Sequence, residues 1–167
     1  MAGCGTLYPP YGAKAVSKGG EQSLPILRFG VFDDFKGGAT LLLWGDTEGL
    51  TELHGVLRSL ADRQISVAEL NQLCCGRPVD GTRVQLRTAR APDEVMTVRR
   101  LAGAAEVEWP LTTERLTEAA KLLEPLMKPG CGTGHQYLPT TGRDALQVII
   151  SKGEYGADFR RQDPRKL

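Results

Sequence analysis

Two stretches of the chain place apolar residues at helical spacing, and this feature limits the fold more than any other. The first stretch has leucines at intervals of three, four and three residues: Leu50, Leu53, Leu57 and Leu60. This spacing puts the four side chains on one face of a helix. Asp46 or Thr47 is suited to cap its N-terminus, because the side-chain oxygen can accept an unpaired backbone N–H. The fold must therefore supply an apolar surface that covers this helix.

The second helical stretch follows Thr112 or Thr113, and either residue is a suitable N-cap. Its apolar stripe consists of Leu116, Ala119, Ala120 and Leu123. Proline disfavours helical backbone in the residue before it, so the sequence predicts that this helix ends at Pro125.

Seven of the remaining segments are predicted as strands: 26–33, 39–45, 82–90, 94–101, 105–109, 132–138 and 145–151. Apolar and polar residues alternate in 26–33, 82–90 and 105–109, which is typical of strands with one buried face. The first two and the last two predict hairpins, and the middle three predict an antiparallel meander. The near-continuous apolar run at 39–45 predicts a strand covered on both faces. Residues 65–80 fit either a short helix or an edge strand followed by a loop.

These elements predict an α+β fold in which one antiparallel sheet of six to seven strands carries two amphipathic helices. No internal repeat is apparent in the sequence. Residues 1–23 are rich in glycine and proline and predict a disordered arm. Residues 24–155 predict a single domain, which suits a chain of 167 residues. Residues 156–167 predict a charged C-terminal tail.

Charge and cysteine usage indicate the compartment and the partners. The 21 basic and 20 acidic residues give a net charge of +1, which argues against a nucleic-acid-binding protein. The chain has neither a secretory signal nor an apolar run long enough to cross a membrane. Its four cysteines are then expected to be free thiols in a reducing cytoplasm.

The densest group of chemically active side chains lies near the C-terminus. His135, Gln136 and Tyr137 fall on one predicted strand, and Glu154 and Tyr155 follow the next one. An imidazole beside a phenol and a carboxylate can perform acid–base chemistry. The alternative interpretation is structural, with His135 bonding a turn and the tyrosines packing at the sheet edge. No nucleophile is fixed by the sequence, so a non-enzymatic role is favoured.

A second candidate surface is a basic sheet face that bears Arg83, Arg87 and Arg99. Glu106 and Glu108 are expected nearby, so cross-strand ion pairs would explain these residues structurally. An arginine-rich face would also suit an acidic protein partner.

A metal site is the third alternative. Cys131 and His135 are separated by three residues, and Cys74 with Cys75 would complete four ligands. The usual Cys-x-x-Cys spacing is absent, so the sequence predicts no metal and no cofactor. A Cys131–His135 nucleophile–base pair is a weaker alternative.

The sequence GHQYL, followed by a strand and SKGEY, resembles small bacterial immunity proteins that partner polymorphic toxins. The resemblance covers residues 134–155 and implies an α+β, non-catalytic protein that acts by blocking a toxin. The positions that it marks are His135, Tyr137, Glu154 and Tyr155. The leading hypothesis is therefore a non-enzymatic protein-binding domain that neutralises a toxin-like protein. The alternative is a small enzyme or ligand-binding protein with a site around His135, Tyr137 and Glu154.

Overall fold

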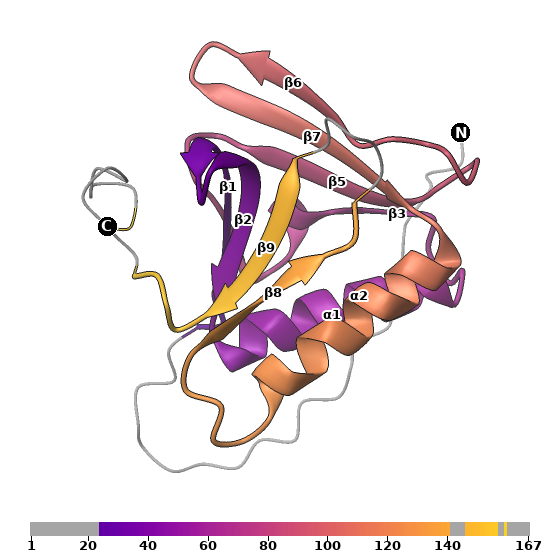
Figure 1. Cartoon of the computed structure of the whole chain (residues 1–167). Coiled ribbons are helices and arrows are strands. Elements are labelled where there is room, and N and C mark those ends of the chain that lie inside the picture. Colours follow the sequence, from indigo (N-terminus) through magenta and orange to yellow (C-terminus); the bar gives the residue numbers. More distant parts are fainter. Residues whose placement is uncertain (1–23, 141–145, 157–158, 160–167) are drawn as a thin grey trace, which may run out of the picture.

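The computed structural model describes residues 24–140, 146–156 and 159, and within them the fold is α+β (Figure 1). The helices are α1 (Thr47–Ala61) and α2 (Thr113–Met127), with a short 3-10 turn, η1 (Leu70–Gln72). The strands are β1 (Leu27–Phe35), β2 (Gly38–Gly45), β3 (Val67–Glu69), β4 (Gly76–Pro78), β5 (Arg83–Thr88), β6 (Thr97–Leu101), β7 (Ala104–Leu111), β8 (Gly134–Leu138) and β9 (Gln147–Lys152). The predicted arm lies outside the described residues, as does most of the turn predicted between β8 and β9 at residues 140–144.

The strands form two mixed sheets, so the prediction of one antiparallel sheet with six to seven strands is wrong. Sheet A has the order β4-β1-β2-β9-β8, and sheet B has the order β3-β5-β7-β6. The β1–β2, β8–β9, β3–β5 and β6–β7 pairs are antiparallel, whereas β1–β4, β2–β9 and β5–β7 are parallel. Alternation of apolar residues specifies the buried face of a strand but not its neighbour, and for this reason the parallel pairs were missed.

Three local expectations change in the structure. The predicted meander is broken because β5 pairs with β7, which leaves β6 at the edge of sheet B. The ambiguous region at 65–80 becomes β3, η1 and β4. Helix α2 continues past Pro125 to Met127. Proline removes one hydrogen bond in this final turn, while burial of Leu126 favours keeping the turn helical.

One apolar core joins both helices to the inner faces of both sheets. The two helices lie side by side (Figure 1), and every leucine of the α1 stripe is fully buried. Sheet A contributes Leu41, Leu43, Val148 and Ile150 to this core, among others, and sheet B contributes Val84, Leu86, Val107 and Trp109. Two N-cap candidates were predicted for each helix, and the structure selects Asp46 and Thr112. Gly49 in α1 has no room for a side chain, because an added Cβ would lie 2.2 Å from the Ile26 carbonyl oxygen.

The chain contains one ββαββ pattern twice, which corrects the expectation of no repeat. The first copy is β1-β2-α1-β3-β5, with the short β4 inserted, and the second is β6-β7-α2-β8-β9. Both helices have 15 residues, and the sequence Thr-Glu-x-Leu-Thr-Glu opens each, at 47–52 and 113–118. Each sheet joins the first hairpin of one copy to the last two strands of the other copy.

Candidate functional site

The residues marked near the C-terminus meet at the β8 edge of sheet A. His135 on β8 lies beside Ser151 on β9, and Glu154 follows in the next turn. The His135 Nδ1 atom lies 3.0 and 3.1 Å from the two carboxylate oxygens of Glu154. Partial burial of the Glu154 carboxyl opposes ionisation, but hydrogen bonds from His135 and Ser151 outweigh it and keep its pKa below the ordinary value. The structure therefore brings together the predicted histidine and an ionised carboxylate.

Ser151 fixes the other side of this carboxylate. Its Oγ lies 2.9 Å from Glu154 Oε2 and 3.2 Å from the Gly134 carbonyl oxygen. A hydroxyl has one proton to donate, so these two acceptors share it. Ser151 is fully buried, and its hydroxyl bonds the carboxylate rather than the imidazole. This arrangement positions His135 and does not provide an accessible nucleophile.

Lys36 completes the group, although sequence reasoning did not select it. Its Nζ lies 3.5 Å from His135 Nε2, across 99 positions of sequence. Lys36 lies in the two-residue turn between β1 and β2, followed by Gly37. The Tyr137 ring contacts the His135 ring edge-on, with centroids 5.6 Å apart, so these two side chains share a face as predicted.

The other two residues of the predicted cluster have different surroundings. Tyr155 packs against Phe159 and Phe35, with ring centroids 4.6 and 5.6 Å away, and burial raises the pKa of its phenol. Phe159 is itself buried, although it falls in the predicted tail. Gln136 alternates with His135 along β8 and so faces the opposite side of sheet A.

The three candidate arginines share the outer face of sheet B. Arg87 forms ion pairs with Glu94 and, at 3.9 Å, with Glu108. Arg99 pairs with Glu106 on the neighbouring strand. The hydrogen bond from Arg87, aided by the backbone N–H of Arg90, lowers the pKa of Glu94 to about 2. The expected cross-strand ion pairs are thus present, and they hold two of the arginines in place.

This outer face of sheet B is open to solvent and hollowed. Arg83 is exposed on β5, in register with Glu106 on β7. A depression of about 640 Å³ is lined by Glu69, Asn71, Gln72, Arg83, Gln85, Glu106, Val107 and Glu108. The face is mixed in charge, because acidic and basic side chains alternate across the strands.

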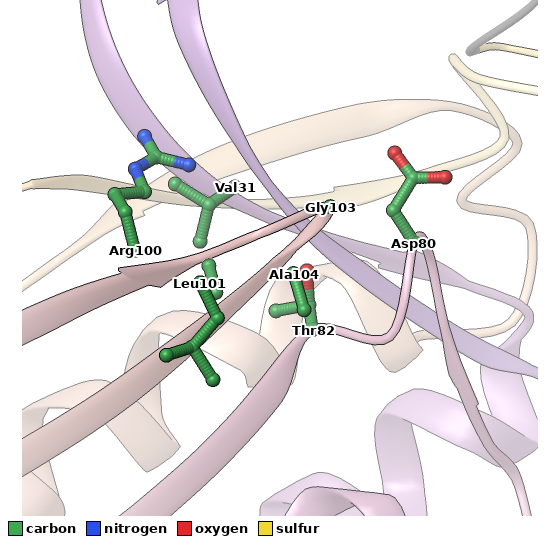
Figure 2. A pocket seen from close by; sticks show the side chains of 8 residues that line it. Val31, Asp80, Thr82, Arg100, Leu101, Gly103 and Ala104 are labelled. Carbon is green, nitrogen blue, oxygen red and sulfur yellow. The ribbon is translucent and has the colours of Figure 1, made fainter.

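A smaller depression of about 220 Å³ lies where the β6–β7 turn approaches β1 (Figure 2). Val31, Leu101 and Ala104 form apolar parts of its wall, and Asp80 and Arg100 stand at opposite ends. Arg100 forms an ion pair with Asp33 of β1, which joins the two sheets. None of the residues that the sequence singled out lines this depression.

The three cysteines that the structure describes do not gather into a metal site. Among the described residues, no group of three or more His, Cys, Asp or Glu side chains is placed to bind a metal ion. Cys74, Cys75 and Cys131 are free thiols. Burial raises the pKa of Cys75 to about 12, so this thiol is a poor nucleophile. Neither described helix has the length and apolarity needed to cross a membrane.

Comparison of the chain with models of known protein families, with curated proteins and with solved structures finds no match.

Proposed function

We propose that this chain is a non-enzymatic, cytoplasmic protein-binding domain that contacts its partner through the outer face of sheet B. The observation that carries the proposal is the contrast between the two sheets. Aromatic side chains cover the outer face of sheet A, whereas that of sheet B presents a hollowed, charged surface over its strands. An open face lined mostly by polar and charged side chains suits a protein surface better than a small molecule, whose binding sites are mostly apolar.

The ion pairs on this face support binding rather than catalysis. Arg87 and Arg99 are already held by glutamates, so less side-chain freedom is lost when a partner docks. Arg83, Gln85 and Glu108 lie on the same face, so the face presents both positive and negative charges to a complementary partner. The resemblance to immunity proteins makes a toxin-like protein the partner that we propose.

Charge reversal on this face tests the proposal. The purified chain is used as bait in an extract of its host cells, and mass spectrometry identifies the protein that it retains stoichiometrically. The Kd between the chain and this purified partner is then measured. Arg83→Glu combined with Glu108→Arg is expected to weaken binding by tenfold or more, since complementary charges would become like charges. The matched control is Lys121→Glu on the exposed side of α2, which should bind as the unmodified chain does.

Equal Kd values for the charge-reversed chain and the control would contradict the proposed contact surface. If the chain neutralises a toxin, the partner must itself be toxic. That partner should arrest bacterial growth when expressed alone and lose this effect when co-expressed with the unmodified chain. A partner that is harmless alone would contradict neutralisation while leaving protein binding intact.

A further inference from the structure

The two ring nitrogens of His135 have different neighbours: Nδ1 contacts the carboxylate of Glu154, whereas Nε2 lies near Lys36. An ionised carboxylate only accepts hydrogen bonds, so the contacts with Glu154 place a proton on Nδ1. The second nitrogen, Nε2, is directed away from that carboxylate and toward Lys36. A carboxylate that holds Nδ1–H in this way fixes the orientation of the ring, and the Nε2–H of the doubly protonated form is then directed toward a ligand.

Lys36 is held beside this nitrogen at a conformational cost. Its φ of 50° lies in the left-handed region, where residues other than glycine, asparagine and aspartate are uncommon. Gly37 follows with a φ of 87°, so both central residues of the turn have positive φ. Asparagine is the residue preferred at the first position of such turns. A lysine in its place supplies a mobile ammonium group that a better turn former would not.

We propose that Lys36 Nζ and the Nε2–H of the doubly protonated form of His135 together donate hydrogen bonds to a small oxyanion, namely a phosphate or carboxylate group. The two nitrogens lie 3.5 Å apart, which lets neighbouring oxygens of one group bond both. Both side chains are accessible, since Lys36 is exposed and the His135 side chain is 32% exposed. Hydrogen bonds from His135 and Ser151 occupy the nearby carboxylate of Glu154, which reduces its repulsion of an incoming anion. This site lies on sheet A and is independent of the proposed partner surface.

The chain provides its own internal control for an NMR test. It has two histidines, so each ring C–H signal can be assigned by one substitution. His54 lies on α1, 3.9 Å from Glu124 of α2, and should not respond to a ligand at the β8 edge. The full chain is titrated with inorganic phosphate and separately with acetate, at constant ionic strength maintained with sodium chloride. A change in pH would move both histidine signals, whereas binding at the site moves only that of His135.

We expect a saturable shift of the His135 signal with a Kd of about 1 mM for at least one of the two anions. Saturation by phosphate alone, by acetate alone or by both would identify the preferred source of the oxyanion. Lys36→Asn removes the ammonium and keeps a favourable turn residue, so it should fold and bind about tenfold more weakly. Lys121→Gln on α2 is the control and should bind as the unmodified chain does.

Two results would overturn the proposal. The first is the absence of a saturable His135 shift with either anion, or equal shifts at His54 and His135. The second is an unchanged Kd in a Lys36→Asn variant whose NMR spectrum shows that it is folded.

Discussion

The outer faces of the two sheets differ, although both sheets follow the same pattern of strands. In sheet A this face carries Phe32, Phe35, Leu42, Trp44 and Ile149, and Phe159 covers them. In sheet B the corresponding strands carry Gln85, Arg99, Glu106 and Glu108, and that face is hollowed and open. Because both inner faces join one core, the difference lies only in the residues that point away from the helices.

This contrast separates the residues that specify the fold from those available for binding. A sheet needs one apolar face to pack on helices, and the other face is free to vary. Sheet A uses its second face for a small aromatic core. Sheet B keeps its second face polar, with side chains held by ion pairs. The repeated architecture therefore contains one sheet whose central strands are covered on both sides and one sheet that can present a whole face.

The largest expected effect follows removal of the aromatic cover from sheet A. Phe159→Ala should lower the free energy of unfolding by about 3 kcal/mol, as expected for deletion of a buried phenyl ring. Trp44 is 3% exposed and contacts Phe159, so its fluorescence should shift to the red. Urea unfolding and emission spectra provide the measurements.

On sheet B, Leu101→Ala removes a side chain that is 45% exposed and should cost no more than about 0.5 kcal/mol. An equal decrease in the free energy of unfolding for Phe159→Ala and Leu101→Ala would contradict the difference between the two faces.

A smaller effect is expected from the buried hydroxyl beside Glu154. Ser151→Ala removes the donor to Glu154 and to the Gly134 carbonyl, and should lower the free energy of unfolding by about 1–2 kcal/mol. Ser66→Ala makes the same chemical change at an exposed position and should be nearly neutral. A neutral Ser151→Ala would mean that Glu154 is positioned by His135 alone.

The smallest effect concerns acid sensitivity, and it compares two glutamates that follow β5 and β9. Each has a pKa below its ordinary value in the folded chain, so each contributes stability that is present above the ordinary pKa and lost as pH falls through the folded one. For Glu94 the window runs from about 4.5 down to about 2. For Glu154 the loss of stability likewise begins at the ordinary carboxyl pKa and ends at the lower pKa of the folded chain.

Glu94→Gln should therefore flatten the decline in stability between about pH 4.5 and about pH 2. Glu154→Gln should flatten it just below the ordinary carboxyl pKa. Urea midpoints measured from neutral to acidic pH provide the comparison. Unchanged acid profiles in both variants would rule out these carboxylates as sources of the acid sensitivity.

Local patterns in the sequence predicted the elements of both copies well. Alternation placed Val84, Leu86 and Val107 inward, and the structure buries all three. The helix caps at Asp46 and Thr112 were also predicted, because capping depends on a few neighbouring residues. The parallel β2–β9 and β5–β7 pairs were not predicted, since they depend on packing between distant segments. The repeated Thr-Glu-x-Leu-Thr-Glu motif was a sequence signal for the duplicated ββαββ unit, although it does not specify which strands pair.

The candidate site was predicted in part for the same reason. His135 and Tyr137 were expected on one face because they are two residues apart on a strand. Glu154 was expected nearby because it follows the paired strand. Lys36 was missed because it reaches His135 from the other end of the chain. The available signal was a two-residue Lys36-Gly37 turn between strands, in which a lysine occupies a position that favours asparagine.

The pairing of β2 with β9 has a consequence for synthesis on the ribosome. Residues 40–45 cannot complete sheet A until residues 147–152 have left the exit tunnel. Until then the apolar β2 lacks its partner and presents an unpaired edge, which is a hazard for aggregation. The order of translation therefore requires the first half of this chain to wait, protected by its own hairpin and helix, until β9 has emerged from the ribosome.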